Sequence, residues 1–249
     1  MCFGALLAVG VSGSGCGGTL HERLGEGAAD YDAAKGAYDR GDFMDAIPDF
    51  KSYIEQYPGT DRTDDALYLL GDCYLHQKDY ALASGQFDRL LRDFPTSPLQ
   101  PDALFALARC DDLQSHGAQL DQTETKRALT RFTQFMDQYP DHARAPEARA
   151  RVKILRDRLA EKTFRTGRLY SKIRQEGAAT MALRQVLTEY PESRWAVDSE
   201  LLLAEVLART GKREEAVEIL ERLLASGLQG EPKRRALDHL KALQGDSPR

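Results

Sequence analysis

The sequence has few cysteines, and they are not arranged to bind a metal. The four thiols are Cys2, Cys16, Cys73 and Cys110, and no two of them form a Cys-x-x-Cys pair. A structural zinc site needs several thiolate or imidazole ligands at close, regular spacing. We therefore expect no metal site. Cys73 and Cys110 fall in helical segments, where a cysteine usually serves as a small buried apolar residue.

Catalytic motifs are also missing. The five histidines are scattered along the chain at His21, His76, His116, His142 and His239. No His-Glu-x-x-His or Gly-x-Ser-x-Gly motif is present. Asp64-Asp65 and Asp111-Asp112 are adjacent in sequence, so their side chains diverge on a helix and cannot act as paired catalytic carboxylates. We expect no catalytic residues and no cofactor.

The charged residues form no basic block. The chain carries 34 Lys and Arg against 39 Asp and Glu, a formal charge of −5, and both signs are spread along its length. Nucleic-acid binding requires a concentrated basic surface that neutralises phosphates. The sequence gives no indication of such a partner.

Residues 1–16 have the composition of a secretory leader. The apolar run Phe3–Val11 is too short to span a bilayer, and small residues separate it from Cys16. This arrangement resembles a bacterial lipoprotein signal, in which the cysteine is lipidated and becomes the N-terminus. Gly17 then resembles the residue that allows transport to the outer membrane. We expect residues 17–27 to be a flexible tether; the alternative is an N-terminal tail without a signal.

An aromatic residue followed by proline recurs along the chain. The pairs are Tyr57-Pro58, Phe94-Pro95, Tyr139-Pro140 and Tyr190-Pro191. Each closes an amphipathic segment, and proline stops a helix because it lacks the N–H and forces the preceding residue out of the helical region. The recurrence predicts tandem helical repeats.

Small and large residues recur at fixed offsets within these units. In the second unit Gly71 and Ala83 are small, where two helices would cross closely, and Phe87 is large. This pattern resembles the tetratricopeptide (TPR) repeat. It predicts an all-α, right-handed TPR superhelix of about five helix-turn-helix repeats, which bury their apolar faces against one another. A bulky residue at Gly71 or Ala83 would hold the two helices apart.

Two segments depart from the regular repeat. Gln114–Thr123 is polar and lengthens the third unit, so we interpret it as a long loop inside that repeat. Pro146–Lys172 contains no strong breaker except Gly167, which predicts one unusually long helix. We expect repeats 1–3 in residues 28–142, the long helix with repeats 4–5 in residues 143–244, and a tail at 245–249.

Several stretches resemble the BamD family, lipoproteins of the machine that assembles outer-membrane β-barrels. They are Arg158-Leu159-Ala160-Glu161-Lys162, Leu169-Tyr170, and Arg184-x2-Leu187-x2-Tyr190-Pro191-Glu192-Ser193. The resemblance implies a non-catalytic scaffold on the periplasmic face of the outer membrane, anchored by lipid. The implied partners are a BamA-like barrel subunit, other lipoproteins of the machine, and unfolded outer-membrane protein precursors.

Two alternatives stay open. One is a periplasmic TPR adaptor of another envelope system, such as the coordinator associated with Tol-Pal. That family usually opens with a coiled coil, and no sustained heptads precede Tyr31. The other is a TPR adaptor for an unrelated partner.

Residues that recur at the same positions in the first helices of repeats 1–3 predict a peptide-binding groove. Tyr31, Tyr68 and Phe105 share one repeat position, and Lys35, Asp72 and Arg109 share the next; Tyr38 lies one turn further along. Aromatic rings flanked by cations suit a peptide that ends in an aromatic residue and a carboxylate, which the BamD resemblance also implies for barrel precursors. The alternative for these rings is ordinary packing between repeats.

Cys73 and Cys110 also share one repeat position, in adjacent units. Packed helices lie about 8–10 Å apart, whereas a disulfide needs α-carbons within about 7 Å. We predict that both thiols stay reduced.

Overall fold

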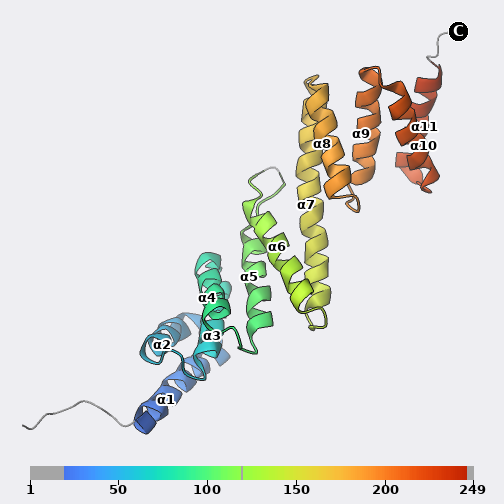
Figure 1. Ribbon diagram of the computed structural model, residues 1–249. Coiled ribbons are helices and arrows are strands. Elements are labelled where there is room, and N and C mark those ends of the chain that lie inside the picture. The colour runs from blue at the N-terminus through green and yellow to red at the C-terminus, as the bar shows by residue number, and fades with distance from the viewer. Residues whose placement is uncertain (1–19, 119, 246–249) are drawn as a thin grey trace, which may run out of the picture.

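The computed structural model describes residues 20–118 and 120–245, which form eleven α-helices and no strand. The helices are α1 Leu20–Asp39, α2 Phe43–Gln56, α3 Thr63–His76, α4 Tyr80–Asp93, α5 Gln100–Gln114, α6 Thr123–Gln138, α7 Ala145–Lys172, α8 Glu176–Glu189, α9 Ala196–Arg209, α10 Arg213–Ala225 and α11 Gly230–Gly245. They form an elongated array in which each helix packs mainly on its neighbours in the chain (Figure 1). The first ten helices make five TPR-type pairs.

The aromatic residue of each aromatic-proline pair is the C-cap of a second helix, as the sequence predicts. Helices α2, α4, α6 and α8 end one residue before the aromatic, whose φ lies between −125° and −134° and whose ψ lies between 50° and 64°. Those angles are outside the α region, because the following proline excludes it. Proline therefore sets the boundary between repeats.

The turns inside four repeats share one backbone conformation. Gly41, Lys78, Arg174 and Gly211 all have positive φ, between 61° and 82°. In each turn the next residue donates its N–H to a carbonyl five residues upstream, as Asp79 does to Tyr74 at 2.9 Å. This is the Schellman ending of a helix. Helix α5 ends differently, since its C-cap Ser115 is extended, with φ −69° and ψ 142°.

Close helix crossings depend on glycine. A Cβ on Gly71 would lie 2.7 Å from the ring of Phe87. Gly167 meets Leu183 in the same way in the fourth repeat. Gly71 therefore lies where two helices cross closely, as predicted, whereas its contact with Ala83 stays a prediction. The large side chain of the second helix lies over the glycine.

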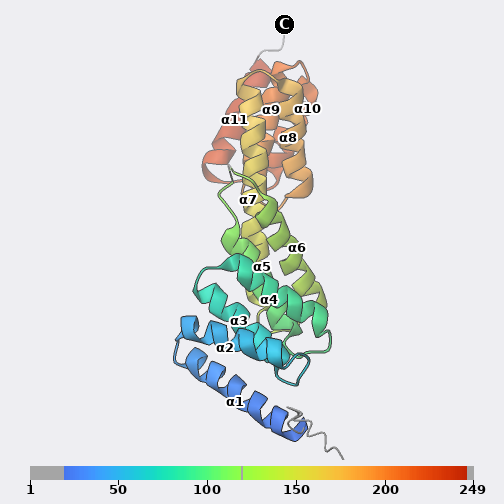
Figure 2. The same cartoon turned by 90° about the vertical axis from the view of Figure 1, so that its left-hand side faces the viewer.

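The two irregular segments occur where the sequence predicts them. Helix α7 has 28 residues and packs on both α6 and α8, so it belongs to both halves of the array (Figure 2). The predicted loop of the third repeat separates α5 from α6.

The helical array extends further at both ends than the sequence predicts. Residues 20–27, expected in the tether, belong to α1, since Leu20, Glu22 and Arg23 are good helix formers and Gly27 packs on the ring of Tyr57. Helix α11, which was not predicted as a separate element, packs on α9 and α10 and includes Gly245. A terminal helix of this kind covers the apolar face of the last repeat.

Candidate binding surface on the first helices

The aromatic rings predicted to line the groove are mostly buried inside the repeats. Tyr31 is 6% exposed and Phe105 is 1% exposed. Tyr31 makes edge contacts with Phe50 and Tyr53, its centroid lying 6.2 and 5.5 Å from theirs. The prediction that Tyr31 and Phe105 are open to a ligand is therefore wrong. Their Cβ atoms point toward the second helix of the same repeat.

Phe105 shows the same packing in the third repeat. Its ring lies 5.4 Å from the rings of both Phe132 and Phe135 on α6. Tyr68 is half-buried, 5.6 Å from Phe87, and burial together with the charge of Asp102 raises its pKa.

Phe164 is a fourth member of this register that the sequence analysis missed. It precedes Gly167 by three residues, as Tyr68 precedes Gly71, and that spacing could have identified it. Its ring is 7% exposed and stacks on Trp195 at 5.1 Å. Because the register extends into the C-terminal half, it is a packing feature of the repeat.

Tyr38 and Asp72, both predicted site residues, do come together. Tyr38 Oη donates a 2.6 Å hydrogen bond to Asp72 Oδ2, which joins α1 to α3. His76 Nε2 lies 3.5 Å from the same oxygen, and the His76 ring stacks on Phe43 at 4.0 Å. Burial, and then the bond to Asp72, raises the pKa of Tyr38. This cluster holds the first two repeats together.

A hollow of about 240 Å³ lies beside that cluster. It is lined by Asp72, Leu75, His76, Lys78, Tyr80, Arg109 and Leu113. Arg109 is exposed and forms no ion pair within residues 20–118 and 120–245. Lys35 is not part of the lining. Its ammonium pairs with Asp39 at 2.7 Å. Of the predicted site residues, Asp72 and Arg109 therefore line this hollow, and Tyr38 is joined to it through its hydrogen bond to Asp72.

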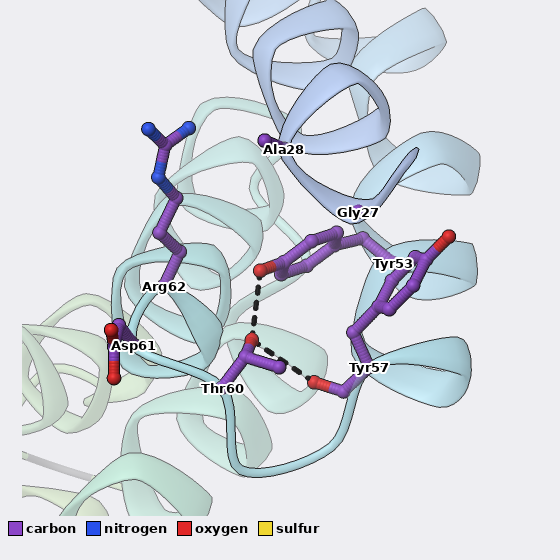
Figure 3. Close-up of a pocket in the computed structure, with 7 residues that line it drawn as sticks. All are labelled: Gly27, Ala28, Tyr53, Tyr57, Thr60, Asp61 and Arg62. Atoms are coloured by element: carbon purple, nitrogen blue, oxygen red, sulfur yellow. Dashed lines mark hydrogen bonds between the residues drawn. The ribbon is translucent and has the colours of Figure 1, made fainter. Parts of the chain in front are cut away.

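A second hollow, also about 240 Å³, lies between α1 and the α2–α3 turn (Figure 3). The hydroxyls of Tyr53 and Thr60 share a 2.9 Å hydrogen bond there. The guanidinium of Arg62 lies 4.9 Å from the Tyr31 ring and pairs with Asp32 at 2.7 Å. Burial raises the pKa of Tyr31 to about 12. The sequence analysis did not identify this hollow.

Cys73 and Cys110 are fully buried, as predicted, and their thiols are free in the structure. Burial raises the pKa of Cys73 to about 12 and that of Cys110 to about 11. Cys16 lies outside the described residues. Within those residues no three His, Cys, Asp or Glu side chains are grouped to hold a metal ion, and no helix has the length and apolar character needed to cross a membrane.

Comparison with known proteins identifies the family. The family model described as YfiO, outer membrane lipoprotein, matches residues 26–223. The outer membrane protein assembly factor BamD of Caulobacter vibrioides is 26% identical over 186 residues, covering 75% of this chain and 61% of that protein. BamD of Haemophilus influenzae is 22% identical over 181 residues, 69% of each chain. The chain therefore spans less than the full length of both relatives.

Solved structures with a similar fold are TPR proteins. They include the TPR2AB domain of yeast Sti1 in complex with an Hsp90 peptide, at 12% identity and a TM-score of 0.45, covering 88% of this chain and 83% of that one. A thermophilic TPR protein of Thermus thermophilus is 16% identical with a TM-score of 0.39, covering 86% and 98%. With the family model matched along α1–α10, the chain belongs to the YfiO (BamD) family of outer membrane lipoproteins.

Proposed function

We propose that this protein is a non-catalytic scaffold of the machinery that assembles β-barrel proteins in the outer membrane. The observation that carries the proposal is the family match over residues 26–223. In this role Cys16 carries a lipid that holds the chain on the periplasmic face. Repeats 4–5 dock the barrel-forming subunit and other lipoproteins, and repeats 1–3 receive unfolded barrel precursors.

The hollow beside Arg109 has the chemistry for the end of a precursor. A peptide carboxylate would pair with the Arg109 guanidinium, which has no partner of its own among the described side chains. Leu75, Tyr80 and Leu113 offer apolar surface for a terminal aromatic ring. Asp72 accepts a hydrogen bond from Tyr38 and lies 3.5 Å from His76, and it forms no ion pair with Arg109 among the described side chains.

The scaffold role is tested by co-purification. The full-length protein is extracted from membranes in mild detergent, and the proteins recovered with it are identified by mass spectrometry, with Cys16→Ala as the control. We expect the large barrel-forming subunit, at reduced yield for Cys16→Ala. Recovery of Tol-Pal components or unrelated proteins in its place would overturn the proposal.

The precursor site is tested separately with synthetic peptides that end in phenylalanine. Binding to the full chain is measured for the free carboxylate and for the C-terminal amide. Arg109→Gln should weaken carboxylate binding about tenfold, the loss of one charge-assisted contact, and leave amide binding unchanged. The matched control is Arg149→Gln, because Arg149 is an exposed α7 cation without an ion pair in the described region. Equal effects of the two variants would reject Arg109 as the carboxylate site.

A further inference from the structure

Three exposed apolar side chains cluster where α7 ends. Leu169 is 57% exposed, Ile173 56% and Tyr170 36%. Leu169 and Ile173 are four residues apart, so their side chains lie one above the other on the same helix face. An isolated exposed leucine needs no explanation, but three adjacent large apolar side chains form a surface patch.

All charged residues of the segment that carries the patch are cations. Residues 165–175 contain Arg165, Arg168, Lys172 and Arg174 and no Asp or Glu, in a chain whose net charge is −5. Arg165 and Arg174 pair with Glu161 and Glu176.

Two of these cations have no carboxylate partner. Within the described residues Arg168 and Lys172 form no ion pair; the Arg168 guanidinium lies 6.0 Å from the Phe164 ring. Positive charge at this end of the helix also complements the helix dipole.

The patch lies on a rigid turn. The upper half of α7 extends past α6 in both views, and its end carries the turn to α8, level with the neighbouring C-terminal helices (Figures 1 and 2). The N–H of Gln175 donates to the Tyr170 carbonyl at 2.9 Å, and Arg174 adopts a φ of 62°, so the Schellman turn fixes this end. None of the three apolar residues lines the two hollows on the first helices.

We propose that the end of α7, residues 165–174, inserts its apolar side chains into the surface of an anionic phospholipid bilayer. An exposed apolar turn flanked by cations matches a lipid interface, where the apolar side chains enter the acyl boundary and Arg and Lys contact anionic headgroups. Tyrosine suits the same depth because its ring is apolar and its hydroxyl is polar. A peptide ligand would need a groove that can surround it. The proposal is independent of the assembly role.

The test places a fluorescent reporter in the patch. The full chain carries Cys16→Ser, which removes lipidation, together with Trp195→Phe and Tyr170→Trp, which leave one indole at the turn. Vesicles of phosphatidylcholine with one quarter phosphatidylglycerol are compared with phosphatidylcholine alone, and brominated lipids report contact between the indole and the acyl chains. The matched control moves the indole to Ile154→Trp, since Ile154 is 50% exposed in the middle of the same helix.

We expect anionic vesicles to shift the emission of the indole at position 170 to the blue and brominated lipid to quench it, with neither effect at position 154. Replacing Arg168 and Lys172 by Gln should weaken the response about 30-fold, at about fivefold per surface cation. Leu169→Ser with Ile173→Ser should remove it. Two results would overturn the proposal: an unquenched indole at position 170 on vesicles that retain the protein, or equal quenching at position 154. Either would mean that another segment contacts the membrane.

Discussion

The ring of Phe87 occupies the space that a side chain on Gly71 would need, since a Cβ there would lie 2.7 Å from Cε1 and 2.8 Å from Cζ of the ring. Phe87 is fully buried in the core of the first two repeats and has no open space to move into. Glycine at this position therefore sets how closely α3 and α4 approach.

Gly71→Ala is expected to destabilise the protein by about 1–2 kcal/mol, because overpacking outweighs the better helix propensity of alanine. The control is Gly85→Ala, since Gly85 lies in α4 with nothing within 4 Å of its Cβ position. That change should stabilise by about 0.5–1 kcal/mol. Thermal and urea unfolding check both, and shifts of the same sign would contradict the steric explanation.

Lys78 and Arg174 adopt the left-handed conformation that glycine adopts in the equivalent turns at Gly41 and Gly211. An L side chain is strained there. Lys78→Gly and Arg174→Gly should each stabilise the protein by about 1 kcal/mol, and Gly41→Lys should destabilise it by a similar amount. The measurement is the free energy of unfolding in urea. If Lys78→Gly lowers stability, the lysine makes a contact worth more than its backbone strain.

Asp111 is fully buried and pairs with two arginines of α6. Oδ1 lies 2.5 Å from Arg127 Nη2, and Oδ2 lies 2.5 Å from Arg131 Nη1. The adjacent Asp112 faces α7 instead, 3.4 Å from Arg151, so the two carboxylates diverge as predicted. The Asp111 pairs hold α6 against α5 in the repeat whose two helices are furthest apart in sequence.

Replacing Arg127 and Arg131 together by Gln should destabilise the protein by about 3–5 kcal/mol, because a buried carboxylate is left without a counter-charge. Adding Asp111→Asn to that variant should recover part of the loss, since the uncompensated charge is removed. Urea denaturation of the parent protein, these two variants and Asp111→Asn alone forms the cycle. Additive losses would show that Asp111 does not depend on these arginines.

The buried thiols predict a loss of stability at alkaline pH. In the unfolded chain Cys73 and Cys110 ionise near pH 9, whereas in the fold they stay protonated to about 12 and 11. The folded state then binds more protons, so stability falls as pH rises above 9, by up to about 1.4 kcal/mol per pH unit for each thiol. Cys73→Ala with Cys110→Ala should flatten the decline between pH 9 and 11. If the double variant loses stability just as steeply with pH, groups other than these thiols cause the decline.

The sequence by itself determined the all-helical fold, the repeat boundaries and the long α7. These depend on local chemistry, because proline after Tyr57 or Phe94 ends a helix wherever it occurs and a segment without breakers continues as one. The family also follows from sequence, since the pattern of residues 26–223 is sufficient to match it.

Only the tertiary structure decided which side chains are exposed to solvent. Tyr31 and Phe105 share one repeat position. The spacing alone leaves open whether a side chain at that position is buried against the neighbouring helix or exposed to solvent, and both are buried. The link from Tyr38 to Asp72, separated by 34 residues, and the exposure of Leu169 and Ile173 likewise depend on how the helix pairs stack. Packing between distant segments decides burial, and burial decides which residues can bind.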